Sequence, residues 1–135
     1  MIEITADNII GINEQILKEY LEIHPRNHER IGVRKHELER ILIEAETINS
    51  IIDKAAFILA AIPWAQPFSG GNKRTAYATA KILLENNGYN FEIQSKKDEE
   101  FLRKLLFEIQ EERARLNEAT LAKITLYLHN RTSEI

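Results

Sequence analysis

The sequence predicts an all-α fold, a compact bundle of about six helices, and three observations point to it. Apolar residues recur at helical spacing in most segments. Glycine, proline and short polar stretches separate those segments, and only one brief run alternates as a strand does. The chain has 135 residues, of which 44% are hydrophobic. That size and apolar content suit one globular domain, residues 1–135, with a core of its own.

The first helix is predicted after Thr5 or Asp7, either of which could cap it, and it ends near His24-Pro25. Residues 25–33 are polar and contain a proline and a glycine, so we expect a loop or a small hairpin there. A second, shorter helix follows. The apolar stripes of these two helices are Ile9, Ile12, Ile16, Leu17, Tyr20 and Leu21, and then Leu38, Ile41, Leu42 and Ala45.

Two mostly apolar helices are predicted in the middle of the chain. The first spans about residues 48–62 and is apolar on more than one side, as in a helix surrounded by others; Pro63 is expected to end it. The second begins close to Asn72 and stops at Gly88. These two helices should form the centre of the bundle.

The C-terminal part is predicted to hold a short extended piece and two amphipathic helices. Tyr89 and Phe91 alternate with polar neighbours in the extended piece, and Ser95 and Asn117 are the expected caps of the helices. We expect the last few residues to fray. The apolar positions of the two helices are Phe101, Leu102, Leu105, Leu106 and Ile109, and then Leu121, Ile124 and Leu128.

Composition excludes several classes of function. The chain has no cysteine, so disulfides, cysteine-based zinc sites and a cysteine nucleophile are ruled out, which agrees with a cytoplasmic location. The formal net charge of −3 gives no basic excess, so nucleic acid is not an expected partner. The start resembles no signal peptide, and prolines and glycines interrupt the longest uncharged run, residues 55–72, so no membrane association is expected.

The connection between the two central helices carries the clearest chemical signal. Gly70-Gly71 lead into a helix at Asn72, whose unpaired N–H groups lie at the positive end of the helix dipole. Lys73 and Arg74 add two cations suited to phosphate groups. An ordinary helix start with solvated basic residues explains the same stretch equally well. A Walker-type loop is excluded because Asn72 follows Gly71 and the preceding element is a helix.

The run Gln66-Pro67-Phe68-Ser69-Gly70-Gly71-Asn72-Lys73-Arg74-Thr75-Ala76 resembles the Fic/Doc (Fido) signature, His-x-Phe-x-Asp/Glu-Gly/Ala-Asn-Gly/Lys-Arg. Its ending is similar to that of the Doc (death-on-curing) branch, and residues 32–39, 55–59 and 86–89 extend the likeness. The resemblance implies a Fido-type bundle and transfer of AMP or phosphate from a nucleotide such as ATP to a target protein's hydroxyl. By position, it makes Phe68 the anchor of the loop and assigns the phosphates to Gly70, Gly71, Asn72, Lys73 and Arg74.

The departures from this signature fall on its chemical positions. Gln66 stands at the histidine position, and an amide cannot act as a general base near neutral pH. Gly70 stands at the position of the magnesium-binding acid, so Mg²⁺ would have no protein ligand there and we predict no metal site. Tyr77 falls at the second arginine of the longer motif. The imidazoles of His24, His28, His36 and His129 are expected to be solvated surface groups, and none is assigned the role of the base.

Three functions remain open at this point. The first is a degenerate Fic/Doc-like protein that still binds a nucleotide or phosphate ligand, as a pseudoenzyme or a toxin–antitoxin-related binding protein. The second is an active AMP- or phosphate-transferase whose target belongs to the translation apparatus. The third is a purely structural interaction domain. An antitoxin-like partner would restrain an active form, since Ser95 and Glu99 have only the bare spacing of the family's inhibitory helix.

Overall fold

The computed structural model describes residues 1–25, 32–112 and 114–135. Over these residues it contains six helices and two short strands, which confirms the predicted all-α bundle. The elements are α1 (Ala6–Ile23), α2 (Lys35–Ala45), α3 (Ile51–Ala65), α4 (Asn72–Asn86), β1 (Tyr89–Phe91), α5 (Lys96–Glu111), α6 (Glu118–Arg131) and β2 (Thr132–Glu134).

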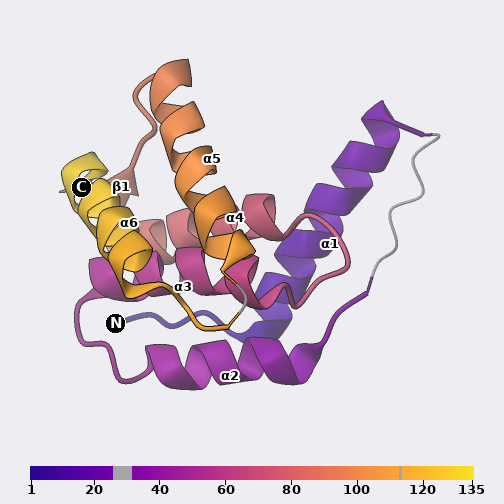
Figure 1. Cartoon of the computed structure of the whole chain (residues 1–135), viewed down its shortest axis with the longest axis horizontal. Coiled ribbons are helices and arrows are strands. Elements are labelled where there is room, and N and C mark those ends of the chain that lie inside the picture. Colours follow the sequence, from indigo (N-terminus) through magenta and orange to yellow (C-terminus); the bar gives the residue numbers. More distant parts are fainter. Residues whose placement is uncertain (26–31, 113) are drawn as a thin grey trace.

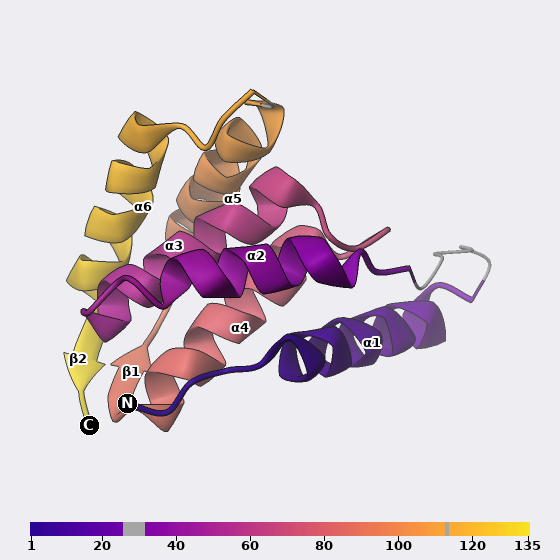
Figure 2. The same cartoon turned by 90° about the horizontal axis from the view of Figure 1, so that it is seen from below.

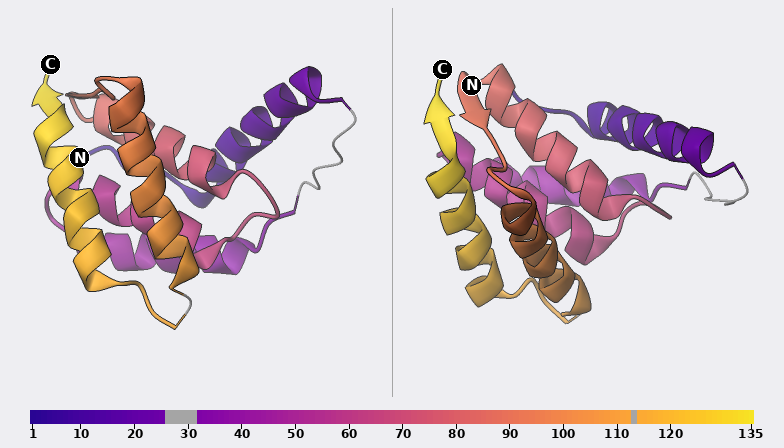
Figure 3. Two further views of the ribbon diagram at one scale, coloured as in Figure 1. Left: turned by 45° about the horizontal axis from the view of Figure 1, so that its top comes forward. Right: turned by 90° about the horizontal axis from the view of Figure 1, so that it is seen from above.

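Helix α3 lies in the middle of the molecule and contacts four other helices, α2, α4, α5 and α6 (Figure 1). Helix α4 packs most extensively against α3 and also contacts α1. Helix α1 lies at the opposite end of the molecule from α6 (Figure 3). The two apolar helices predicted from the sequence therefore form the centre, and the others cover them.

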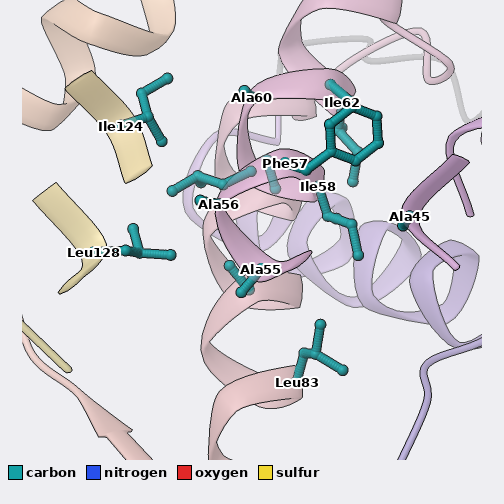
Figure 4. Packing of buried hydrophobic residues seen from close by; sticks show 14 of the residues in the cluster. Ala45, Ala55, Ala56, Phe57, Ile58, Ala60, Ile62, Leu83, Ile124 and Leu128 are labelled. Carbon is teal, nitrogen blue, oxygen red and sulfur yellow. The ribbon is translucent and has the colours of Figure 1, made fainter. Parts of the chain in front are cut away.

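The core is built around α3, in which ten apolar residues and Lys54 are buried. Figure 4 shows Ala55 and Ala56 between Leu83 of α4 and Ile124 and Leu128 of α6. Small side chains in the middle of a helix allow its neighbours to approach closely, and the larger aliphatic residues then fill the space between the helices. Such a core holds both ends of α3, including the end that leads into the loop, in fixed positions.

Side-chain caps set the starts of four helices, at Thr5, Ser50, Ser95 and Asn117. Each accepts a hydrogen bond from the backbone N–H three residues later, at distances of 3.0 to 3.3 Å. The caps predicted at Ser95 and Asn117 are confirmed, and Thr5 rather than Asp7 caps α1. Because Ser50 caps α3, this helix begins at Ile51, later than predicted.

The prediction that Pro63 ends the third helix is wrong, because α3 continues to Ala65. Proline removes one backbone donor, but in the last turn of a helix that loss affects a single hydrogen bond. The turn still closes, since the Gln66 N–H donates to the carbonyl of Ile62 at 2.8 Å. Pro63 is itself buried in the core, which offsets the lost bond.

The last residues do not fray as predicted, because they form β2, which pairs antiparallel with β1 (Figure 2). Phe91 lies opposite Thr132, and the Ile135 N–H donates to the Gly88 carbonyl at 2.9 Å. The backbone groups of β1 need hydrogen-bond partners, and the chain end supplies them. Residues 132–135 show no strand-like apolar alternation, so this pairing was not visible in the sequence.

The small hairpin predicted within residues 25–33 lies largely outside the described residues. In the part of the chain that the structure describes, no helix combines the length and apolar content that crossing a membrane requires.

An ion pair joins the start of α5 to the end of α6. Arg131 Nε donates to both carboxylate oxygens of Asp98, at 2.7 and 2.8 Å, and its guanidinium lies over the ring of Tyr127 at 3.7 Å. The bonds from Arg131 lower the pKa of Asp98 and raise that of Arg131, while burial, together with the nearby Asp98, raises the pKa of Tyr127. The contact positions α5, which lines the clefts described below.

We expect Asp98→Asn to lower the free energy of unfolding at pH 7 by about 1–3 kcal/mol, because the charged acceptor of Arg131 is lost. The depressed pKa of Asp98 makes its contribution complete above the unfolded-state value of about 3.9 and progressively lost as the pH falls through the native value. Urea denaturation between pH 7 and pH 3 should therefore show the difference between wild type and variant shrinking in acid. Glu100→Gln, an exposed change in the same helical turn, is the control, and a difference that does not change with pH would contradict the assignment.

Candidate functional site

The loop between α3 and α4 starts with a residue in an unusual backbone conformation. Gln66 has φ 48° and ψ 58°, and it is the only non-glycine residue with positive φ in the described chain. This conformation costs about 1–2 kcal/mol for a residue with a side chain, so the surroundings must hold it. Arg34 stabilises this conformation, because its Nη2 donates to the carbonyls of Ala65 and Gln66 at 2.9 and 2.6 Å.

The segment just before α2 pairs with this loop. The Arg34 N–H donates to the Pro67 carbonyl at 2.7 Å and the Ser69 N–H donates to the Gly32 carbonyl at 3.0 Å, so that Val33 and Phe68 form an antiparallel bridge. A Cβ at position 32 would overlap Ser69 Oγ, so a larger residue than Gly32 would require the Ser69 side chain to move. Two segments far apart in sequence thus meet at the loop.

Phe68 and Asn72 fix the middle of the loop. Phe68 is buried, and its backbone N–H and carbonyl are both bonded by the side-chain amide of Asn72, at 3.1 and 2.9 Å. The side chain of Asn72, which the sequence assigns to phosphate binding, is therefore committed to the loop itself. Its backbone N–H, in the first turn of α4, is the group left to face an anion.

The side chain of Asn13, on α1, hydrogen-bonds the end of the loop and the first turn of α4. It is fully buried, and its Nδ2 donates to the Gly70 carbonyl at 2.9 Å and to Thr75 Oγ1 at 3.0 Å. Gly71 follows with φ 73°, a conformation that favours glycine. A Cβ at Gly71 would lie 3.4 Å from both Asn13 Nδ2 and Leu17 Cδ2.

Helix α4 begins without a side-chain cap, because Gly71 occupies the capping position. The N–H groups of its first turn are therefore available to solvent or to an anion, at the end of the helix that carries about half a positive charge. Most of the other helices in the described chain have a polar side chain at this position. The uncapped start makes this end of α4 suitable for a phosphate group.

The two cations of the loop lie against aromatic rings from opposite sides. Lys73 Nζ is 5.3 Å from the ring centre of Phe107 on α5, and the Arg74 guanidinium is 4.8 Å from that of Tyr20 on α1. Such contacts are favourable and restrict the two side chains without neutralising them. The two cations at the start of α4 thus lie toward different helices, α5 and α1.

Two clefts open beside these cations. The smaller, of about 410 Å³, is lined by Gln66, Gly71, Asn72, Lys73, Arg74, Arg103 and Gln110. The larger, of about 560 Å³, is lined by Lys73, Arg74, Tyr77, Ile93, Gln94, Ser95, Glu99, Leu102, Arg103 and Leu106. A volume of this size suits a small organic ligand. The smaller cleft gathers most of the predicted phosphate-binding residues, and the larger one offers an adjoining, partly apolar space.

The residues present do not form a magnesium site. Gly70 offers no carboxylate, and among the described residues that line the smaller cleft none is acidic. Within the described ranges, no group of three or more histidine, aspartate or glutamate side chains could hold a metal ion. Mg²⁺ prefers carboxylate oxygens along with water and phosphate, so the protein itself supplies no such ligand at this loop.

Three of the four histidines lie in the part of the chain that the structure describes, and each contacts a neighbouring side chain. His129 Nε2 is 2.7 Å from Asp53 Oδ1, in a half-exposed contact between α6 and α3, and His36 is 3.3 Å from Glu37 on α2. His24 packs against Tyr20 at the end of α1. None of these three lines either cleft, and His28 lies outside the described residues.

Sequence reasoning missed several residues of the site. Asn13 had a signal, because it is a polar residue within the apolar stripe of the first helix, one turn from Ile9 and Leu17. Arg34 also had a signal, because it lies in residues 32–39, which extend the family likeness, but no role was assigned to it. Tyr20, Arg103 and Gln110 had no distinguishing pattern, and the last two are polar residues on an amphipathic helix. Only the packing of α5 beside the loop brings the last two into the cleft.

Residues 3–84 match the family model described as the Fic/DOC family. The chain belongs to the Fic/DOC family. The matched range runs from the N-terminus through α4 and includes the whole loop, so the family assignment rests on the segment that forms the candidate site. A search of curated proteins found no match. Helices α5 and α6 of this Fic/DOC protein lie beyond the matched residues.

Asn13→Ala should lower the free energy of unfolding by about 1–3 kcal/mol, because it leaves the Gly70 carbonyl and Thr75 Oγ1 without their buried donor. Gln15→Ala, an exposed substitution on the same helix, should change it by less than about 0.5 kcal/mol. Urea denaturation of both variants checks this expectation. Equal stabilities would mean that Asn13 does not fasten the loop to α1.

Proposed function

We propose that this Fic/DOC protein binds a nucleotide or another phosphate ligand at the start of α4 without catalysing the family's transfer reaction. It acts as a pseudoenzyme or a toxin–antitoxin-related binding protein through a protein partner. The observation that carries the proposal is the meeting of Lys73, Arg74 and the uncapped first turn of α4 in one cleft. The run from Asn72 to Ala76 further favours a Doc-like member.

The binding half of the proposal rests on complementary charge and geometry. Arg74 can contact two phosphate oxygens at once, Lys73 supplies a point charge, and backbone N–H groups of α4 point toward the same place. The hydrogen bonds from Asn13, Arg34 and Asn72 hold the loop in shape before any ligand arrives. A loop that is already ordered loses little conformational entropy on binding, and this favours affinity.

The loss of catalysis rests on Gln66. It lines the smaller cleft with Lys73 and Arg74, so the residue at the histidine position of the signature would lie beside a bound phosphate. Its amide has no proton-accepting nitrogen near neutral pH, and losing a general base typically slows a reaction by about a hundredfold to ten-thousandfold. With no carboxylate at Gly70 either, the site lacks both groups that the signature uses for chemistry.

Calorimetric titration with ATP tests the binding half. We expect wild type to bind and Arg74→Ala to bind about ten- to a hundredfold more weakly, since a charged hydrogen bond to phosphate is lost. Arg40→Ala is the matched control, because Arg40 is an exposed arginine of α2 that pairs with Glu37 away from both clefts. Absence of binding by wild type would leave the fold without this function.

A labelling experiment tests the catalytic half. Wild type incubated with cell lysate should transfer label neither from α-labelled ATP, which would report AMP transfer, nor from γ-labelled ATP, which would report phosphate transfer. The Gln66→His, Gly70→Asp double variant restores both signature groups and serves as the comparison. Labelling of a lysate protein by wild type would establish an active transferase and overturn the proposal.

A further inference from the structure

We propose that Arg103 of α5 is the third cation of the phosphate site and that the site binds a polyphosphate without a divalent metal ion. This inference rests on the proposed function and specifies its ligand chemistry. It places in the site a residue from outside the range that matches the family model, residues 3–84.

The position of Arg103 is the first argument. Both clefts beside the loop are lined by the same three cations, Lys73, Arg74 and Arg103. The first two belong to the loop's own helix, whereas Arg103 reaches the clefts from α5. Arg103 therefore stands where the two clefts adjoin, opposite the start of α4. A ligand whose phosphates contact Lys73 and Arg74 would bring further phosphate oxygens toward Arg103.

Charge balance is the second argument. A polyphosphate carries several negative charges, which a divalent cation commonly neutralises when acidic side chains hold that cation. The described lining of the smaller cleft has no acidic residue, and it has three cationic ones beside the positive end of a helix. Among the described residues that line the larger cleft, Glu99 is the acidic one, and it is already paired with Arg103. A guanidinium can replace part of the neutralising role, because it is always charged and contacts phosphate oxygens in pairs. Two lining amides, Gln66 and Gln110, add neutral donors.

The contacts of Arg103 leave it able to bind a ligand. Its Nη2 donates to Glu99 Oε1 at 2.6 Å, one turn away on the same helix. The side chains of Arg103 and Glu99 are 68% and 49% exposed. An ion pair with this much exposure to solvent is weak. A guanidinium has five N–H donors, so one bond to Glu99 leaves several for phosphate. The pair also keeps the guanidinium near the cleft.

The test is calorimetric titration with ATP, once in EDTA and once with excess Mg²⁺, on wild type and on four variants: Arg103→Gln, Arg40→Gln, Glu99→Gln and Arg74→Ala. Wild type should bind in EDTA at least as tightly as with Mg²⁺. Arg103→Gln should weaken binding in EDTA by about ten- to a hundredfold, the effect of losing a charged hydrogen bond to phosphate. Arg40→Gln should leave the affinity unchanged. Equal thermal midpoints of wild type and Arg103→Gln would show that the exposed substitution leaves the fold intact.

Glu99→Gln separates ligand contact from a structural role of the ion pair. It removes the partner of Arg103 and keeps the cation, so affinity should stay the same or rise. A loss as large as that in Arg103→Gln would mean that the intrahelical pair itself, and not contact between Arg103 and the ligand, supports binding, and it would overturn the inference.

Two further results would overturn the inference while leaving the proposed function intact. These are binding by wild type that requires Mg²⁺, and Arg103→Gln binding as wild type does while Arg74→Ala does not. A failure of wild type to bind ATP in either buffer would overturn the proposed function and this inference together.

Discussion

The packing of α3 against α4 is the constraint on which the rest of the structure depends. Both helices contribute small side chains to their contact, including Ala55, Ala56, Ala76 and Ala80, which are all fully buried. Two helices packed this closely leave the loop between them little freedom. The other helices then cover the pair, with α1 and α2 toward one side and α5 and α6 toward the other (Figures 1 and 3).

The loop itself is held by hydrogen bonds that come from three directions. Asn13 reaches it from α1, Arg34 from the segment before α2, and Asn72 from the start of α4. Together they satisfy backbone carbonyl groups of the loop, and they hold Gln66 in a backbone conformation that is otherwise unfavourable. The groups that stay available to a ligand are the first N–H groups of α4 and the side chains of Lys73 and Arg74.

These contacts explain how the loop can keep its shape when the residues at the chemical positions of the signature change. The groups that fold the loop differ from the groups that would move a proton or hold a metal, so Gln66 and Gly70 can depart from the signature without disturbing the hydrogen bonds of Asn13 and Asn72. Gln66 enters these contacts only through its backbone carbonyl and N–H, so the hydrogen bonds do not depend on the chemistry of its side chain. A binding protein built on the family's fold is physically consistent with such a sequence.

The sequence by itself determined the all-α class, the order of the helices and the family. It also determined the caps that four helices use, Thr5, Ser50, Ser95 and Asn117. All of these follow from local patterns, which are helical periodicity, capping residues and the loop signature. Of the caps, only Ser50 was not recognised beforehand. Local patterns misplaced the end of α3, since Pro63 is buried in its last turn and that turn still closes through the Gln66 N–H. They also missed β2, which forms because the backbone groups of residues 132–134 pair with those of β1. Tertiary structure alone brought Asn13 and Arg34 under the loop and Arg103 and Gln110 beside it. Such contacts join residues 30 or more positions apart, and no periodicity or spacing within one segment encodes them.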